Sequence, residues 1–404
     1  MRLCITTALS ALFLLSPSAV ARQNPTDDSV VHGTINVALG NRNGLVVLTD
    51  SMITAGGHQL PNPGQKLFKL DDHTVCSFAG FSSAAAISAP GSSPKAAVPD
   101  LNTSASAIIH QYVRQSAGQS QQSIAERLRA ISFLMGRHLS AIANVRDALG
   151  NPTPIDGYRF QLIVAGYDVD EKPKIGRITL RMKDDRGSFV SEVEEAAITI
   201  VEDKIVWQLN GMPDVAIQLL QHPESKSRDA ALAQYAASLK ADGGKSLSIE
   251  QMVALAKSLA YYTSQAHPEV GGVNQVAILQ KSQSVSIEQP AFPEPPRPLV
   301  GFSLVVNSEF SYAGVAFAPP AVFVRCSWTG MERDLDGNFY IGNKFTKSHL
   351  LYDGGAVNLG ETNEVVDSVL LLGPHVKLGD ETARRLAKEF SWSQILRAVP
   401  KPAP

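Results

Sequence analysis

The chain has 404 residues, of which 44% are hydrophobic and 18% charged, a composition that allows a large buried core and favours a folded globular protein. The net charge is −2 and no long run of lysine and arginine occurs, so nucleic acid and anionic membranes are poor candidates for partners. The sequence contains no Gly-rich phosphate loop, metal-ligand cluster or dinucleotide fingerprint, so we expect no cofactor and no metal.

The N-terminal segment differs from the rest of the chain. It carries Arg2, an apolar run over about 3–15, and the small residues Ala-Val-Ala at 19–21. This order predicts a secretory signal peptide over 1–21, and the apolar run is short for a membrane span. An N-terminal anchor is the alternative. We therefore expect an exported protein, periplasmic or secreted, without a membrane span once the signal is removed.

Strand signals dominate residues 34–80. TINVALG and GLVVLTDS are separated by the turn sequence NRNG, and a second strand pair, KLFKL and TVCSFAG, surrounds an Asp-Asp turn. Two successive hairpins predict the beginning of an antiparallel sheet. Cys76 and Cys326 lie in apolar runs, which predicts core positions rather than disulfide or metal chemistry.

Helices and strands then follow in blocks. A Pro/Ser/Ala-rich loop leads into two helices, which are followed by strands, by three more helices and by a last strand; the expected helices span 103–116, 120–146, 212–222, 226–240 and 248–264. Such blocks favour a sandwich of antiparallel sheets with helices outside over a doubly wound parallel sheet. This first domain is expected to span 34–287.

A Pro-rich segment, EQPAFPEPPRP at 288–298, predicts a linker and a domain boundary. Beyond it, residues 299–404 are expected to form a small strand-rich unit with a terminal helix. Segments beginning at Asn343 and Asn363 share a faint 20-residue period, which hints at two solenoid coils, with chance similarity as the alternative.

The Gly33-Thr34 pair before the first strand suggests nucleophilic chemistry. A threonine hydroxyl needs a base within hydrogen-bond reach. If the chain is cut after Gly33, Thr34 gains a free α-amino group, which titrates near ~7.7–8.0 and can act as that base. Glycine at the cleavage position tolerates the backbone distortion that self-cleavage requires.

The two hairpins can bring further groups to the same end of the sheet. Asp50 ends the second strand and Lys66 begins the third, so both can lie beside Thr34. A lysine paired with Asp50 would favour the alkoxide of Thr34. The backbone N–H of Gly80, after the fourth strand, could serve as an oxyanion donor. Each residue alone has an ordinary structural explanation, as a turn, a turn cap or an edge lysine.

The segment from Thr34 to Gly80 resembles the proteasome β-subunit branch of the N-terminal nucleophile hydrolases. The threonine, the GLVVLTDS segment, the lysine and the Ala-Gly pair fall at the family spacings without a gap. The resemblance implies Thr34 as nucleophile, Asp50 and Lys66 as the charge pair beside it, and Gly80 as oxyanion donor. It also implies an α+β fold, a four-layer αββα sandwich, and a propeptide, here 22–33, that is removed by self-cleavage.

The resemblance continues more loosely to about residue 284, with departures. His267 and Val270 precede Gly271-Gly272, where the family has Asp and then Ser, and Asn210 stands where a family turn often has Ser. Asn210 and His267 could still support the terminal amine by hydrogen bonding, whereas Val270 cannot. A helix-end role for His267 is an equal alternative.

These observations predict an exported N-terminal-threonine hydrolase that cuts peptide or other amide bonds after self-cleavage at Gly33-Thr34. The substrate would be a peptide or a small amide. A non-catalytic protein of the same fold, used for assembly or binding, is the alternative, and an unrelated β-rich binding protein is a third. The sequence leaves monomer, dimer and ring open, so a homo-oligomer is allowed.

Overall fold

The computed structural model describes residues 31–32, 34–55, 58–59, 63–80, 83–84, 103–119, 121–143, 159–185, 188–292, 302–311, 320–355, 357–359, 362–377 and 379–397. The predicted signal peptide, Gly33 and residues 22–30 of the predicted propeptide lie outside the described residues, as does most of the predicted linker.

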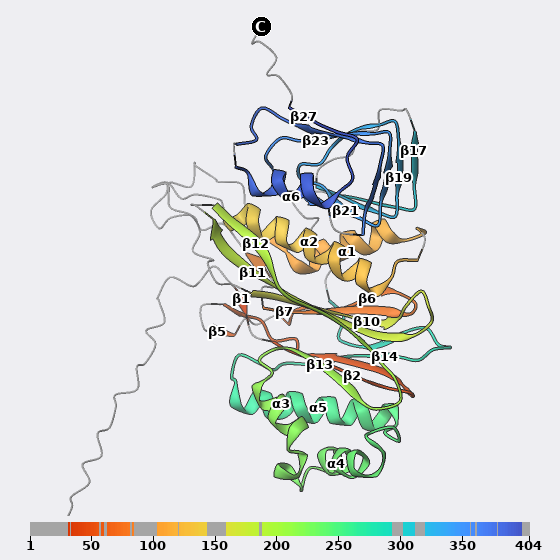
Figure 1. Ribbon diagram of the computed structural model, residues 1–404. Helices are drawn as coiled ribbons and strands as arrows, with labels where there is room; N and C mark the ends of the chain where they lie inside the picture. The colour runs from red at the N-terminus through yellow and green to blue at the C-terminus, as the bar shows by residue number, and fades with distance from the viewer. Residues whose placement is uncertain are drawn as a thin grey trace, which may run out of the picture.

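Two five-stranded antiparallel sheets face each other in the first part of the chain (Figure 1). The first sheet has the order β13 (Val206–Gly211), β2 (Ile35–Asn41), β3 (Gly44–Thr49), β14 (Gln275–Leu279) and β15 (Ser286–Glu288). The second has the order β12 (Ser188–Ile200), β11 (Pro173–Asp185), β10 (Arg159–Tyr167), β7 (Thr74–Gly80) and β6 (Leu67–Asp71). Short strands add two small sheets, β1 (Val31–His32), β4 (Thr54–Ala55) and β5 (His58–Gln59), and β8 (Ser83–Ala84) with β9 (Thr103–Ser104).

Each sheet is covered by helices on one face and by the other sheet on the opposite face. This explains why the sequences of the first strands are continuous apolar runs. In β2, Ile35, Val37 and Leu39 pack against the helices, whereas Ala38 faces the other sheet. The first sheet is covered by α3 (Asp214–Gln221), the short 3-10 turn η1 (Pro223–Lys226), α4 (Ala230–Asp242) and α5 (Ile249–Ala266). Helix α5 begins with a capping box between Ser248 and Gln251.

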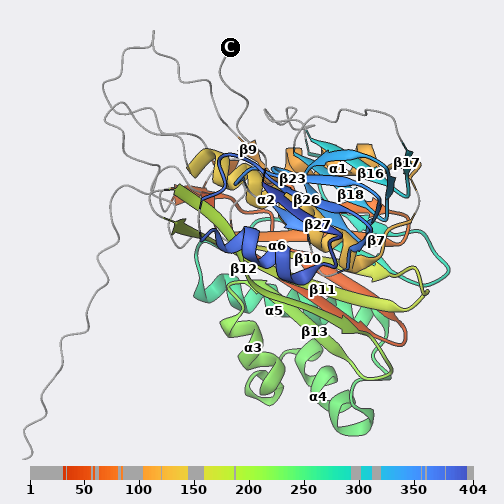
Figure 2. The same cartoon turned by 45° about the horizontal axis from the view of Figure 1, so that its top comes forward.

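Two helices, α1 (Ala105–Ser116) and α2 (Ile124–Ala143), cover the second sheet. A parallel β-solenoid lies on their other side, so that α1 and α2 are sandwiched between a sheet and the solenoid (Figures 1 and 2). Phe302, Leu304 and Val322 of the solenoid share one apolar cluster with Ile108 and Ile131 of these helices.

The solenoid consists of three four-stranded parallel sheets. The first sheet contains β16 (Ser303–Val306), β18 (Ala321–Val324), β21 (Phe339–Ile341) and β24 (Asn358–Leu359). The second contains β17 (Glu309–Ser311), β19 (Ser327–Thr329), β22 (Lys344–Thr346) and β25 (Glu364–Val366). The third contains β20 (Glu332–Asp334), β23 (His349–Tyr352), β26 (Val369–Leu372) and β27 (Gln394–Arg397). Helix α6 (Glu381–Glu389) precedes β27. Asn343 and Asn363 lie at equivalent places in successive coils.

The predicted fold class, an α+β four-layer αββα sandwich with a small strand-rich unit, is wrong for this chain. The described residues form six α-helices and seven sheets, three of which make the parallel solenoid, so the protein is more strand-rich than that description. The helix layer of α1 and α2 is also internal, because the apolar outer face of β16, β18 and β21 packs on it. The described part of the 299–404 unit is thus joined to the rest by a shared core.

Candidate functional site

Thr34 lies immediately before β2 and is 3% exposed. Its carbonyl oxygen accepts a hydrogen bond of 3.0 Å from the backbone N–H of Met212. Gly211, with a φ of +83°, makes this approach possible, because a Cβ atom at that position would lie 2.0 Å from the Thr34 carbonyl oxygen. The end of β13 therefore fixes the backbone of Thr34.

Asp50 follows β3 and is 1% exposed. Its Oδ1 accepts from the backbone N–H of Ile35 at 3.2 Å, and its Oδ2 accepts from that of Gly271 at 3.0 Å. Both backbone donors hold the carboxylate in one orientation beside the first residue of β2.

Lys66 precedes β6 in the second sheet and is 2% exposed. Its ammonium donates to the hydroxyl oxygen of Thr34, to Asp50 Oδ1 at 3.2 Å and to the carbonyl of Met52 at 2.5 Å. The structure thus brings Thr34, Asp50 and Lys66 into one hydrogen-bonded group between the sheets.

Burial acts on both charged groups of this site. It lowers the pKa of the Lys66 ammonium, and the nearby Asp50 charge opposes that shift. Burial likewise raises the pKa of the Asp50 carboxyl, against the opposing effects of the Lys66 charge and the Gly271 N–H. A lysine with a lowered pKa, touching a hydroxyl, can take a proton from that hydroxyl or return one to it.

Gly80 ends β7 at a φ of +90°, where a Cβ atom would lie 2.3 Å from the carbonyl oxygen of Arg159. The side chain of Ala79 and the Thr34 carbonyl oxygen both lie close to Gly211, at 3.3 Å and 2.0 Å from the point where its Cβ would be. The end of β7 therefore lies beside Thr34, as the predicted role of Gly80 requires.

The Gly271-Gly272 turn docks on the segment that follows β3. Met52 donates its backbone N–H to the Gly271 carbonyl at 2.9 Å, and Val273 donates its N–H to Ser51 Oγ at 2.8 Å. Gly272 has a φ of +77° and lies so close to Ser51 that a Cβ atom would approach Ser51 Oγ to 2.7 Å. This turn supports Asp50 through backbone groups, independently of the side chain at 270.

The two supporting residues suggested by the sequence have different surroundings. Asn210 is fully buried in β13, directly opposite Asn36 of β2, and the amide atoms of both side chains lack hydrogen-bond partners among the described residues. His267 is the C-cap residue after α5, and its Nε2 lies 2.8 Å from the carboxylate of Asp214 at the first turn of α3. Val270 is buried in the apolar cluster around that helix.

Gln275 is a site residue that the sequence analysis missed. It is fully buried in β14, and its side chain contacts the backbone of both Lys66 and Asp50. The available signal was a single glutamine inside the apolar run VNQVAIL.

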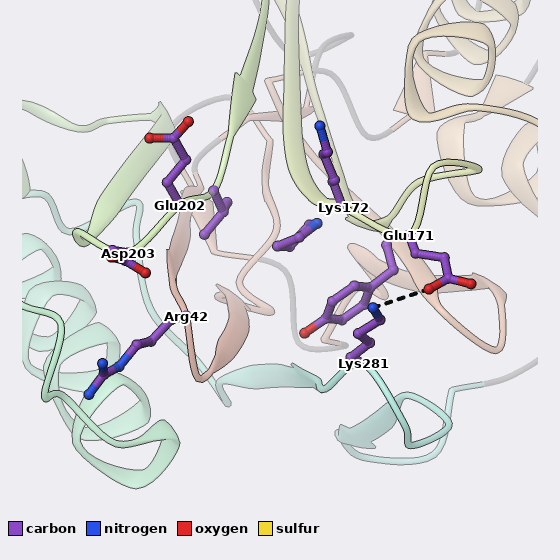
Figure 3. A pocket seen from close by; sticks show the side chains of 9 residues that line it. Arg42, Glu171, Lys172, Glu202, Asp203 and Lys281 are labelled. Atoms are coloured by element: carbon purple, nitrogen blue, oxygen red, sulfur yellow. Dashed lines mark ion pairs between the residues drawn. The ribbon is translucent and has the colours of Figure 1, made fainter.

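Other parts of the described chain offer little competing chemistry. No group of three or more His, Cys, Asp or Glu residues there is arranged to hold a metal ion. A hollow at the hairpin turns carries both charge signs, and in Figure 3 its Arg42 and Lys172 side chains point in different directions while Lys281 pairs with Glu171 at 3.1 Å. Of the helices in the described segments, none is long and apolar enough to cross a membrane.

Models of known protein families and curated proteins were both compared with the chain, and neither comparison gives a match.

Proposed function

We propose that this protein is an exported N-terminal-threonine hydrolase that cuts amide bonds after cleaving its own chain between Gly33 and Thr34. The observation that carries the proposal is the contact of the Lys66 ammonium with both Thr34 Oγ and Asp50, in a group whose three side chains are at most 3% exposed. Burial of an ion pair costs free energy, so its retention beside a hydroxyl favours a chemical role.

Self-cleavage would begin with Thr34 Oγ attacking the carbonyl carbon of Gly33. The α-nitrogen of Thr34 is still part of a peptide bond at this stage, so it cannot act as a base. Lys66 is in hydrogen-bond contact with the hydroxyl, and burial lowers its pKa and so favours its neutral amine form, which would take the proton and become the ammonium. The C–N bond breaks as the nitrogen is protonated, an ester forms at Oγ, and water then releases residue 33 as a carboxylate.

The pairing of β1 with β4 supports this step. Val31 lies opposite Ala55 and His32 opposite Thr54, so the chain just before the cleaved bond is held as a strand. Once this segment leaves, the same edge of β4 could pair with another extended chain. This favours a peptide over a small amide as substrate.

In the mature protein the freed α-amino group would serve as the base. Thr34 Oγ attacks the substrate carbonyl, its proton passes to the amine, and the amine protonates the leaving nitrogen. The backbone N–H of Gly80 would stabilise the oxyanion. Water attacks the resulting ester, and the acyl group leaves as a carboxylic acid.

A non-catalytic assembly or binding role is the second candidate. It is favoured by the buried, apolar Val270, which stands where the resembled family has a hydrogen-bonding serine. The two candidates predict different mature chains.

The test is the intact mass of the purified chain and of a Thr34→Ala variant, together with hydrolysis of a mixture of fluorogenic peptide amides. The proposal expects a chain beginning at Thr34, an unprocessed Thr34→Ala variant, and hydrolysis by the parent alone. A parent chain that keeps residues 22–33 and hydrolyses nothing would favour the binding role. Unchanged processing of Thr34→Ala would show that another protease makes the cut.

A further inference from the structure

Gln275 lies in β14, next to β3 in the first sheet and opposite Thr49. Its side chain is fully buried and points toward β6, which belongs to the second sheet. It therefore links the two sheets at the level of the site.

All the hydrogen-bonding groups of this amide are used. Oε1 accepts from the backbone N–H groups of Lys66 at 3.0 Å and Leu67 at 3.1 Å. Nε2 donates to the carbonyl of Gly64 at 2.7 Å and, at 3.5 Å, to that of Asp50. Because two backbone N–H groups meet one side-chain atom, that atom must be the oxygen, which settles the amide orientation.

These contacts hold the main chain at Lys66 and on both sides of it. The residues on both sides of it, within the segment 64–67, are tied to one amide on the opposite sheet, and the same amide contacts the backbone of Asp50. A long, flexible lysine side chain loses rotamer entropy when its ammonium is fixed. Fixing the backbone at its base reduces the number of positions from which Lys66 can approach Thr34.

On the basis of the proposed function, we propose that Gln275 is a positioning residue that sets the Lys66 ammonium between Thr34 Oγ and Asp50. Gln275 does not touch the reacting atoms, and its effect on the reaction passes through the backbone of Lys66. Loss of its amide would let the start of β6 move relative to β2, and a displacement of about 1 Å at a reacting group can cost on the order of 100-fold in rate.

Asn41 provides a matched comparison. It is also fully buried, at the far end of β2, and its Nδ2 donates to the carbonyls of Gly244 and Leu247 at 2.9 Å each. It ties a loop to a strand as Gln275 does, but its partners include no charged group. Asn41→Leu should therefore lower stability without changing the chemistry at Thr34.

The experiment uses mature chains beginning at Thr34, released from a cleavable N-terminal fusion so that self-cleavage is not required. A β-lactone probe is added, and its attachment is followed by intact mass. Thr34 Oγ forms an ester with the lactone carbonyl, the ring C–O bond breaks, and the released alkoxide takes the hydroxyl proton, so that no atoms are lost. Rates at saturating probe are measured against pH for the parent, Thr34→Ala, Gln275→Leu, Gln275→Asn and Asn41→Leu.

We expect Gln275→Leu to react ten- to 100-fold more slowly than the parent, by the order-of-magnitude cost of misplacement. The midpoint of its pH–rate profile should move to higher pH, because the Lys66 charge, which faces Asp50 and the Thr34 amine, moves away from that amine and lets it keep its proton to higher pH. Gln275→Asn keeps the amide but is one methylene shorter, so it should change both quantities in the same direction by a smaller amount. Asn41→Leu should match the parent in both quantities at temperatures where it is folded.

Equal rates and midpoints for Gln275→Leu and Asn41→Leu would overturn the positioning role. If Gln275→Leu does not fold, a folded Gln275→Asn variant that matches the parent overturns it equally. A parent chain that does not react at Thr34 overturns the proposed function itself, and the role of Gln275 with it. Reaction of the parent but not of Thr34→Ala, with unchanged Gln275 variants, would overturn only the inference about Gln275.

Discussion

The two-sheet part of the chain and the solenoid both bury polar side chains, but they use them differently. In the solenoid, Asn343 Oδ1 accepts from the backbone N–H of Cys326 at 3.1 Å, and one coil further on Asn363 Oδ1 accepts from that of Asn343 at 2.8 Å. Ser348 and Ser368 form a similar ladder, in which the N–H of Ser348 donates to Ser368 Oγ at 3.0 Å. These groups recur from coil to coil and satisfy backbone atoms inside the turns.

At one place, the two-sheet part instead buries an ion pair that does not recur along the chain. Asp50 and Lys66 are almost fully buried and form an ion pair at 3.2 Å, beside a hydroxyl. The two kinds of buried polar group therefore differ in whether they repeat. Neutral side chains that recur from coil to coil stabilise the solenoid, whereas an ion pair that occurs once, beside a hydroxyl, points to chemistry.

The largest effect is expected from breaking the charged group. Lys66→Met leaves the Asp50 carboxylate buried without its cation, which should cost about 3–5 kcal/mol of unfolding free energy and also abolish self-cleavage. Urea unfolding and intact mass measure the two effects. The control is Lys344→Met, because Lys344 pairs with Glu364 across two coils but both are about half exposed, at 51% and 59%, so little change is expected. Similar losses of unfolding free energy in Lys66→Met and Lys344→Met would contradict the distinction between the buried ion pair and the exposed one.

The second prediction concerns a solenoid residue, whose replacement should lower stability but leave self-cleavage unchanged. Asn343→Leu removes the acceptor of a buried backbone N–H and the donor to the Phe323 carbonyl, so it should destabilise the chain by about 2–3 kcal/mol. Its processing at Gly33-Thr34 should match the parent, because the solenoid contributes no group to the site described above. Urea unfolding shows the first effect and intact mass the second. A stable but unprocessed Asn343→Leu chain would mean that the solenoid acts on the site.

The same comparison shows how far the sequence could be interpreted. The sequence predicted that Thr34, Asp50 and Lys66 lie together at one end of a single sheet formed by two hairpins. In the structure the hairpins belong to different sheets, β2 and β3 to the first and β6 and β7 to the second, so Lys66 reaches Thr34 and Asp50 across the space between the sheets. Gln275 could not be assigned, because its contacts with Lys66 cross between sheets over more than 200 residues. The family resemblance gave no warning of this contact.

The solenoid was only hinted at because its coils vary in length. Lys344 pairs with Glu364, 20 residues later, but Ser327 pairs with Lys344 only 17 residues later. A sequence period therefore survives in the last coils alone. The error in fold class has a related cause, because the packing of the solenoid on α1 and α2 depends on an apolar outer face that appears only when the coils stack.

A third prediction concerns pH and the helix layer between the two regions. His138 of α2 is 4% exposed, and burial lowers its pKa to about 4. Between pH 6.5 and 4 the unfolded chain binds a proton there that the folded chain does not, so stability falls as the pH falls, by about 2 kcal/mol at pH 5. His138→Leu should remove this contribution. Urea unfolding at pH 7 and pH 5 measures it, and His222→Leu, at a largely exposed histidine, is the control. An unchanged acid dependence in His138→Leu would contradict the assignment.

The smallest effect is expected where the two regions meet. Three glutamines spaced four residues apart donate to carbonyls at the start of the solenoid. Gln111 and Gln115 on α1 donate to Phe302 at 3.2 and 2.6 Å, and Gln119, just after α1, donates to Leu304 at 3.1 Å. Strand β16 is the edge of its sheet, so these amides take the place of a neighbouring strand. Gln115→Ala should cost about 1 kcal/mol, since the Phe302 carbonyl keeps Gln111 as a donor.

Replacing all three glutamines by alanine would remove these side-chain donors from that edge, and this variant tests the comparison between the two regions most directly. If α1 only supports the solenoid, the triple variant is processed normally and loses more stability than the three single variants together, because Gln111 and Gln115 share the Phe302 carbonyl. However, His110 on the same helix lies 3.2 Å from the side-chain oxygen of Gln65, the residue before Lys66. Slower appearance of the chain beginning at Thr34, measured by intact mass during expression at a temperature where the variant is folded, would show that support of the solenoid and placement of Lys66 depend on one helix.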